Sequence, residues 1–218
     1  SSALVLLDLS AAFDTVNHQI LLSTLEKLLG LSDTVLDWFR SYFTDRYLFV
    51  AISPSRPDTV VDRQGIPQGS VLGPLMFCIY MLPLGNILRK HRLGFHFYAD
   101  DTQVYISTNT DTAIATALLV TCLQDIKAWM QLSFLQLNCK KTEVVLIGTR
   151  TIINNVSSYS LNINGVKVLP SSEVRNLGVI FDSQLSFDAH VKSVAKGYDL
   201  YYHNLQLNDS STPLFHPV

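Results

Sequence analysis

The sequence has little of the positive charge that is typical of nucleic-acid-binding domains. Its 218 residues include 16 Lys and Arg against 18 Asp and Glu, which gives a net charge of −2 at pH 7 and a pI of about 6.3. A domain that binds a polyanion normally carries a basic surplus. The overall charge therefore gives no sign of nucleic-acid binding, and any such function has to be inferred from a particular site.

Cysteine is scarce as well. Cys78, Cys122 and Cys139 are odd in number and widely spaced, with no C-x-x-C pair, and the six histidines form no H-E-x-x-H pair. This pattern indicates neither a disulfide framework nor a zinc site. A reducing, intracellular setting fits it best.

The sequence also lacks a signal peptide, and no initiator Met precedes Ser1, so we expect a chain cut from a longer protein. Residues 71–88 are the most apolar run and approach the length of a membrane span. Two prolines and two glycines interrupt this run, and no aromatic belt or basic flank frames it. The run therefore predicts a buried helix, and we expect no transmembrane segment and no contact with a membrane.

What is present is the composition of a folded protein, with 48% hydrophobic, 16% charged and 10% aromatic residues. A continuous apolar run predicts a buried strand that ends near Asp8. Apolar spacing predicts helices at 19–29, 33–43, 71–88, 111–130 and from 188 onward. Strands are expected within 47–52, 59–64, 93–107, 141–149, 160–169 and 175–182, with hairpin turns at Asp100–Asp101 and Asn164–Gly165. This order predicts an α+β fold, an antiparallel sheet packed on helices.

The adjacent carboxylates of Asp100 and Asp101 are the sharpest chemical feature. They lie in an alternating segment between aromatic and apolar residues, so two like charges are crowded at the tip of a hairpin. A divalent cation would relieve their repulsion. A solvated Asp-Asp turn is the common alternative, and the pair taken alone favours that alternative.

Asp8 changes this balance, because a charge directly after a buried apolar strand is costly. If the strand lies beside the Asp100–Asp101 hairpin, three carboxylates converge on one spot. Mg²⁺ is held by few carboxylates together with substrate phosphates, and two such ions can clamp an in-line phosphoryl displacement. A strand-end cap is the alternative for Asp8, and we expect Asp14 to be an acid at a helix N-terminus.

The segment GIPQGSVLGP, residues 65–74, spaces three glycines four residues apart around the start of the apolar helix. Glycine lets a backbone approach a ligand closely, and a helix N-terminus suits phosphate. An ordinary loop before a buried helix is the alternative, so this segment alone is a weak signal.

Together these elements resemble the palm of a reverse transcriptase. LLDLSAAFDTVNH resembles motif A of that family, QGIPQGSVLGPLMF motif B, FYADD motif C, LNCKKTEVVLIGT motif D, and NLGVIFDSQLSF motif E, the primer grip. Motifs A and B are similar to those of non-LTR (LINE-type) retrotransposons. The resemblance covers roughly residues 3–190. It implies a polymerase palm and RNA-directed DNA polymerase activity.

The resemblance implies catalytic roles at the matching positions. Asp8, Asp100 and Asp101 would bind two Mg²⁺ ions, for which Mn²⁺ could substitute, with Asp8 and Asp100 bridging both ions and Asp101 more peripheral. Lys141, or Lys140 beside it, would protonate the departing pyrophosphate, and a solvated basic turn is the alternative for both lysines.

The resemblance also implies contacts with substrates. The Leu9 carbonyl would add a metal ligand, and Gln68 and Gly69 would lie against the incoming nucleotide and template. The Phe13 ring would be the steric gate that excludes a ribose 2′-OH, with a core aromatic as the alternative. Leu177 and Gly178 would help to position the primer terminus.

Residues 1–183 are expected to form the palm, and residues 184–218 a truncated or divergent start of the thumb. The fingers, which supply basic residues in the family, are expected to be missing, and this would explain the near-neutral charge. The implied partners are an RNA template, a DNA primer and dNTPs, and no specific protein partner is indicated. A nuclear or cytoplasmic location rests on family analogy alone.

Two other functions stay open at this point. One is a catalytically inactive palm fragment that at most binds nucleic acid, which primer extension would distinguish from a polymerase. The other is an RNA-dependent RNA polymerase with a related palm, which Phe13 at the gate position disfavours.

Overall fold

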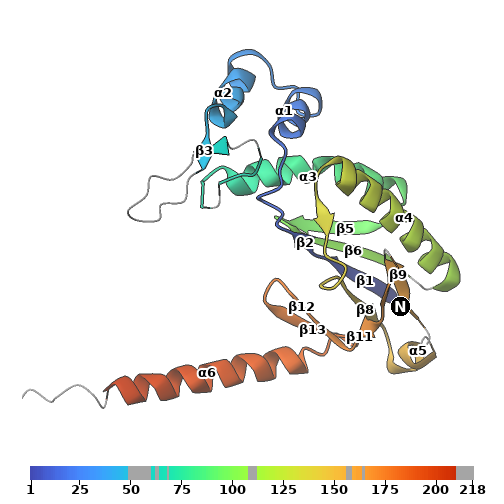
Figure 1. Cartoon of the computed structure of the whole chain (residues 1–218). Helices are drawn as coiled ribbons and strands as arrows, with labels where there is room; N and C mark the ends of the chain where they lie inside the picture. The colour runs from blue at the N-terminus through green and yellow to red at the C-terminus, as the bar shows by residue number, and fades with distance from the viewer. Residues whose placement is uncertain are drawn as a thin grey trace, which may run out of the picture.

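The computed structural model describes residues 1–48, 60–61, 64–67, 69–107, 112–155, 159–163 and 165–209. Its centre is a five-stranded sheet in the order β11-β8-β1-β6-β5 (Figure 1). The strands are β1 (Ser2–Leu7), β5 (Gly94–Tyr98), β6 (Asp101–Ser107), β8 (Glu143–Ile147) and β11 (Pro170–Ser171). Neighbouring strands are antiparallel except for β11, which is parallel to β8. The expected α+β class and antiparallel sheet are confirmed.

The sheet has one buried face and one more open face, because alternate side chains of a strand point to opposite sides. On β1, every second residue from Ala3 to Leu7 is buried. On β6, Thr102 and Val104 are buried, whereas Asp101 on the opposite side is exposed. Polar side chains therefore project from the open face.

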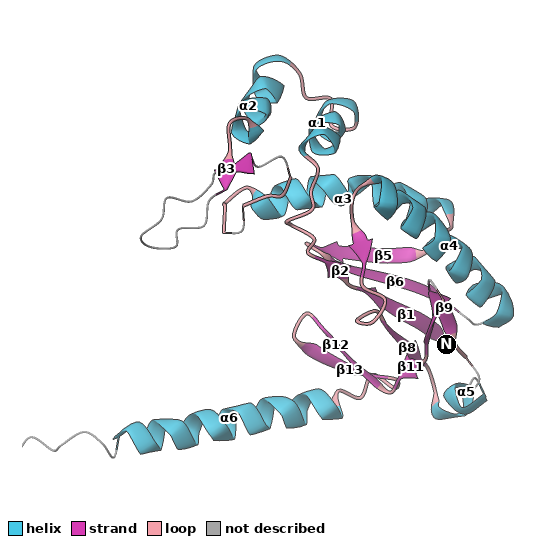
Figure 2. Cartoon of the chain, in the orientation of Figure 1, coloured by secondary structure: helices cyan, strands magenta, loops and turns pink. Residues whose placement is uncertain are grey.

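Two long helices cover the buried face (Figure 2). These are α3 (Gly73–Lys90), which contacts β5, and α4 (Thr112–Leu132), which contacts β6. The side chains that α3 contributes to the core are Met76, Phe77, Tyr80, Met81, Leu84 and Leu88. The buried helix predicted at 71–88 is confirmed.

Within the described part of the chain, one segment, Ala113–Leu132 of α4, is long and apolar enough to cross a membrane by length and composition. In the fold, Leu119, Cys122, Ile126 and Met130 of this helix are buried in the core. They recur at helical spacing, so one face of α4 is used to cover the sheet.

A smaller group of elements follows motif A in the chain. It contains α1 (His18–Lys27), α2 (Asp33–Phe43) and the paired strands β3 (Tyr47–Leu48) and β4 (Val60–Val61). Helix α1 packs on both α2 and α3. Of the strands expected at 47–52 and 59–64, residues 47–48 and 60–61 pair as predicted, and residues 49–59 and 62–63 lie outside the described residues.

Helix α1 begins later than Asp14. Its N-cap is Asn17, whose side-chain oxygen accepts hydrogen bonds from the backbone N–H groups of Gln19 and Ile20 at 3.0 and 3.1 Å. Asp14 lies in the preceding turn, where its N–H donates to Ala11. The expected position of Asp14 at a helix N-terminus is wrong, because the chain turns at residues 11–15 and the helix begins only after Asn17.

Residues 175–182 also differ from the expected single strand. Here β12 (Glu173–Asn176) and β13 (Val179–Asp182) form an antiparallel hairpin. Leu177 and Gly178 make its turn, both with positive φ, of 47° and 85°. Positive φ at both central residues is the geometry of a two-residue turn that matches strand twist. The apolar Leu177 gives no turn signal, so the sequence looks continuous.

Several short elements give no periodic pattern in the sequence and are not anticipated by it. They are β2 (Leu9–Ser10), β7 (Gln136–Leu137) and α5 (Arg150–Asn155). The predicted hairpin near Gly165 is present as β9 (Leu161–Ile163) and β10 (Val166–Val168), although Asn164 lies outside the described residues. The last helix, α6 (Asp188–Asp209), extends away from the sheet (Figure 1).

Asp182 fastens β13 to the turn before α6. Its carboxylate accepts hydrogen bonds from the N–H groups of Gln184, Ser186 and Phe187 and from the Ser186 hydroxyl, at 2.8 to 3.1 Å. Burial opposes the ionisation of this carboxyl, but the four hydrogen bonds outweigh burial and lower the pKa of Asp182 to about 2. The start of α6 is therefore held by an ionised side chain.

We predict that Gly65→Ala destabilises the fold more than Gly30→Ala does. Both glycines have positive φ, 90° and 69°. An added Cβ at Gly65 would lie 3.1 Å from the Asp14 carbonyl oxygen, whereas at Gly30 it would meet nothing within 4 Å. We expect a cost of about 1 kcal/mol at Gly30 and about 2–3 kcal/mol at Gly65, measured by urea unfolding. Equal losses would contradict the steric part of this argument.

Candidate active site

Asp8 lies where β1 ends and the chain crosses into β2. The Asp8 carbonyl accepts a hydrogen bond of 2.9 Å from the Asn138 N–H, and Leu9 pairs with Leu137 on β7. These backbone bonds hold the residue on both sides. Asp8 is therefore fixed at the end of the central strand, as its position after the apolar run predicts.

Asp100 and Asp101 lie at the turn of the β5–β6 hairpin. Tyr98 pairs with Asp101, so Ala99 and Asp100 form the two-residue turn, with φ of 52° at Ala99. The hairpin predicted around the acid pair is confirmed. Its tip is one residue earlier than expected, because Asp101 is already the first residue of β6.

The pairing of β1 with β6 brings the two segments together. Leu7 is opposite Thr102 in this antiparallel register, so the next residues, Asp8 and Asp101, follow side by side. Burial, then the charge of Asp100, then that of Asp8, raise the pKa of the Asp101 carboxyl above its usual value. Asp8 and Asp100 therefore both lie within electrostatic reach of the Asp101 carboxyl.

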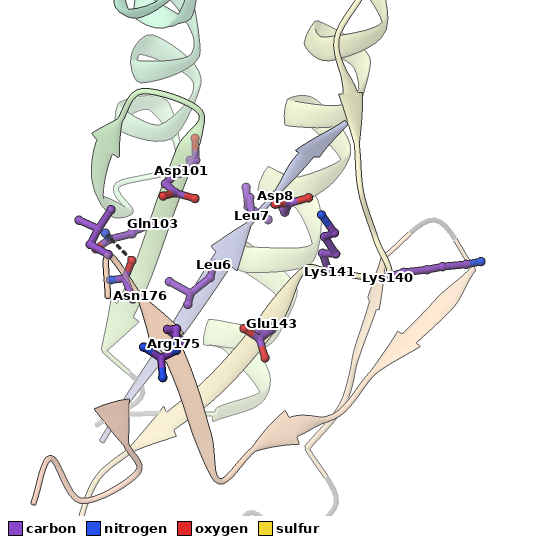
Figure 3. A pocket seen from close by; sticks show the side chains of 12 residues that line it. Leu6, Leu7, Asp8, Asp101, Gln103, Lys140, Lys141, Glu143, Arg175 and Asn176 are labelled. Atoms are coloured by element: carbon purple, nitrogen blue, oxygen red, sulfur yellow. Dashed lines mark hydrogen bonds between the residues drawn. The ribbon is translucent and has the colours of Figure 1, made fainter. Parts of the chain in front are cut away.

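A cavity of about 440 Å³ opens beside these acids (Figure 3). The charged side chains that line it are three acids and three bases: Asp8, Asp101, Glu143, Lys140, Lys141 and Arg175. Of the residues predicted from the sequence, Asp8, Asp101, Lys141, Lys140 and Leu177 meet here. A near-neutral chain thus has a cavity that offers both carboxylates for a cation and bases for phosphate.

The two lysines of motif D lie differently. The Lys141 side chain lies on the side of the cavity where Asp8 is, whereas Lys140 points away from the carboxylates (Figure 3). The Lys141 N–H donates to the Asn138 carbonyl at 3.1 Å, in the same turn that binds Asp8. This arrangement favours Lys141 over Lys140 as the proton donor.

The Asp8 carboxylate has the features of a metal ligand. Its Oδ2 atom is buried and has no hydrogen-bond partner among the residues that the structure describes. An unpaired buried carboxylate oxygen is costly, and a bound cation would remove that cost. Asp8 and Asp101 therefore fit the donor type that Mg²⁺ prefers.

Among the described residues, no three His, Cys, Asp or Glu side chains are gathered so that they could enclose a metal ion by themselves. Mg²⁺ usually takes one or two protein carboxylates and completes its shell with water and substrate phosphates. Asp8 and Asp101 meet this smaller requirement. Asp100, on the turn, does not line the cavity.

The remaining predicted residues lie outside the cavity lining. Leu9 is buried in β2, and the Phe13 ring stacks on Phe77, with centroids 4.7 Å apart and an interplanar angle of 23°. Gly69 is exposed at a turn before α3, with φ of 82°, and Gly178 lies in the β12–β13 turn. Gln68 lies outside the described residues.

Five polar residues of the cavity are not named as site residues by the sequence analysis: Thr102, Gln103, Glu143, Arg175 and Asn176. Strand alternation predicts Gln103 from the sequence, because it is two residues after Asp101 and therefore lies on the same face of the sheet. Asn176 begins the motif E segment, but its contact with Gln103, like the position of Arg175, depends on the packing of a separate hairpin against the sheet and has no local signal.

The chain is similar to known proteins over most of its length. Residues 1–181 match the family described as reverse transcriptase (RNA-dependent DNA polymerase). The chain is 31% identical over 199 residues to a probable RNA-directed DNA polymerase from transposon BS of Drosophila melanogaster, over 88% of this chain and 21% of that protein. It is 29% identical to the RNA-directed DNA polymerase from mobile element jockey of Drosophila funebris, again over 88% and 21%.

A more distant relative is the Pol polyprotein from the type-1 retrotransposable element R2 of Popillia japonica. It is 24% identical to this chain, over 82% of the chain and 30% of that protein. The chain thus spans between a fifth and a third of the length of these relatives.

Solved structures of telomerase have a similar fold. One is telomerase from Candida albicans in complex with a TWJ fragment of telomeric RNA, with a TM-score of 0.60, 15% identity and coverage of 85% of this chain and 31% of that one. Another is apo telomerase from Candida tropicalis truncated from its C-terminal domain, with a TM-score of 0.59, 14% identity and coverage of 86% and 35%.

We predict that Asp101→Asn raises the melting temperature at pH 7 by a few degrees at most. Because the folded-state pKa of Asp101 is raised, its contribution to stability is present below the usual value of 3.8 and is lost as pH rises through the folded value. The gain of the variant should therefore vanish below pH 3.8. Thermal melts from pH 3 to 8 measure this difference in melting temperature. The control is Glu26→Gln, because Glu26 is an exposed acid on α1.

Adding Mg²⁺ should raise the melting temperature of the original chain and leave the Asp101→Asn variant nearly unchanged. The cation would remove the repulsion that the substitution has already relieved. A variant that gains as much from Mg²⁺ as the original chain would show that Asp101 does not bind the ion.

Proposed function

The chain belongs to the reverse transcriptase family, and from this premise we propose that its cavity is the polymerase site of an RNA-directed DNA polymerase. In the proposed reaction, the 3′-OH of a DNA primer attacks the α-phosphate of a dNTP, and pyrophosphate leaves. The observation that carries the proposal is the β1–β6 register, which puts Asp8 beside Asp101 at one end of the sheet.

Asp8 and Asp101, with Asp100 next to them, are the residues that would hold divalent metal ions, Mg²⁺ or Mn²⁺. When bound, such ions supply charge neutralisation on the reacting phosphate and activation of the attacking hydroxyl. The unpaired Oδ2 of Asp8 and the raised pKa of Asp101 support this assignment. The carbonyl of Leu9, just after Asp8, is proposed as a further ligand.

The basic residues of the cavity act on the phosphates. Lys141 is proposed to give its Nζ proton to the leaving pyrophosphate, and Arg175 adds positive charge on the opposite side of the cavity. Gln68 and Gly69 are proposed to lie along the nucleotide and template, where the backbone of the loop before α3 can approach closely.

Residues 1–183 are proposed to be the palm, and residues 184–218 to be the start of a thumb. The support is that α6 extends from the end of the motif E hairpin, away from the sheet (Figure 1). The template RNA, primer and dNTPs are proposed partners, and an intracellular location follows from that proposal. Neither nucleus nor cytoplasm is favoured by the chain itself.

Primer extension tests the function directly. The purified chain is given an RNA template, an annealed DNA primer and dNTPs, with Mg²⁺ or Mn²⁺. We predict extension that falls about a thousandfold or more in Asp8→Asn and in Asp101→Asn, because each removes a charge that acts in the transition state. Glu26→Gln is the matched control and should retain activity.

The outcomes separate the candidate functions. Extension retained in both Asp variants would rule out the metal assignment. No extension by the original chain with either metal, together with binding of the primer–template by fluorescence anisotropy, would favour the inactive nucleic-acid-binding fragment.

Phe13 is predicted to control sugar selection. Its ring is braced by Phe77, and its carbonyl accepts a hydrogen bond of 2.8 Å from the Ile66 N–H. Phe13→Val should raise the ratio of rNTP to dNTP incorporation by about tenfold, since the smaller side chain leaves room for a 2′-OH. Single-nucleotide competition measures this ratio. Phe77→Leu is the control, because it loosens the packing but keeps the gate ring, and an equal change in both variants would assign the effect to packing.

A further inference from the structure

The hairpin β12–β13 is a separate two-stranded unit and is not part of the five-stranded sheet. Its base is held by backbone bonds, since Ser183 donates to the Ser172 carbonyl at 3.2 Å and its own carbonyl accepts from Gly148 at 3.0 Å. Its turn, at Leu177 and Gly178, lies at the other end of the hairpin, and the four residues of β12 separate it from Ser172. Within the described part of the chain, no strand pairing fixes this end of the hairpin relative to the acids, so side-chain contacts must do so.

Two side chains make such a contact. The Gln103 Nε2 donates a hydrogen bond of 3.1 Å to the Asn176 Oδ1, and Asn176 is only 8% exposed (Figure 3). Val174, which is also buried, packs the hairpin against the fold, but apolar contact does not fix a register. The directional amide bond does.

Each partner of this hydrogen bond lies close to a functional element. Gln103 is two residues after Asp101 on β6, and both side chains line the cavity, as the alternation of the strand requires. Asn176 is the last residue of β12, directly before the turn of Leu177 and Gly178. The bond thus joins the strand of the catalytic acid to the end of the hairpin that is proposed to bear the primer.

We propose that the Gln103–Asn176 hydrogen bond is a positioning contact. It sets the distance between the β12–β13 turn and Asp101. Gln103 and Asn176 act through the elements they join and need not touch substrate. The inference about catalysis rests on the proposed polymerase function, whereas the inference about the hairpin does not. Without the bond, the hairpin turn moves relative to the carboxylates, and the primer 3′-OH is less often aligned for attack.

The variants follow from the geometry. Asn176→Ala and Gln103→Ala each remove the bond, and the double variant tests whether the two residues act as one unit. The exchanged pair Gln103→Asn with Asn176→Gln keeps the summed length of the two side chains and should restore the contact. Asn162→Ala is the control, because Asn162 also makes one side-chain hydrogen bond within a hairpin, to the Gly165 N–H at 2.9 Å, away from the cavity.

Amide hydrogen exchange on the purified chain tests the positioning without any need for activity. Exchange in residues 173–182 should be faster by about three- to tenfold in both single Ala variants, as expected for loss of one buried hydrogen bond. Exchange should return towards the original rate in the exchanged pair and should stay unchanged in the Asn162→Ala control. Unaltered exchange in residues 173–182 of both single variants would overturn the proposal.

Steady-state primer extension tests the catalytic consequence. We expect kcat to fall about three- to tenfold in either single Ala variant and no further in the double variant, with the KM for dNTP within about twofold of the original. The exchanged pair should recover most of the lost kcat. The positioning role would be overturned if the losses of kcat in the two single variants added up in the double variant. A change confined to the KM for dNTP would also overturn it. Absence of extension by the original chain would instead count against the proposed function, and hydrogen exchange would still decide the positioning role.

Discussion

The antiparallel pairing of β1 with β6 is the constraint on which the rest of the site depends. Side chains on a strand alternate between two faces, so a slip of one residue would turn every core residue of β6 outward and move Asp101 away from Asp8. Burial of Ala3, Val5 and Val104 against the helices therefore stabilises the fold and also sets the register that places Asp101 beside Asp8. The same packing that selects the register of the sheet also selects the separation of Asp8 and Asp101.

Much of this arrangement follows from local sequence signals. The apolar run before Asp8, the alternation around Asp100–Asp101 and the long apolar helix at 71–88 each match an element of the structure. What the sequence does not reveal is set by contacts between distant segments. Leu177 adopts a positive φ because the hairpin requires it, not because leucine favours it. The bond between Gln103 and Asn176 joins residues 73 positions apart and has no local signature.

A near-neutral net charge is compatible with a charged cavity, because salt screens charges that lie far from the cavity. Asp8, Asp101 and Glu143 share the cavity lining with Lys140, Lys141 and Arg175. At physiological salt, charges beyond roughly 8 Å are largely screened, so a ligand in the cavity senses these side chains and little of the remaining surface. Overall composition is therefore a poor guide to what this site can bind, whereas the order of its motifs is a good one.

The site combines two parts that are held with different stiffness. Asp8 and Asp101 lie at the end of the central sheet and are held by strand pairing, and burial together with the charges of Asp100 and Asp8 raises the pKa of Asp101. The β12–β13 turn is fixed by side chains, which a substrate can displace at lower cost. A polymerase has to hold its metal ligands still while the primer advances one nucleotide after each addition. The proposed polymerase site would meet both demands in a single cavity, because the acids lie on the central sheet, whereas the turn end of the hairpin is held to it by the Gln103–Asn176 hydrogen bond and local packing.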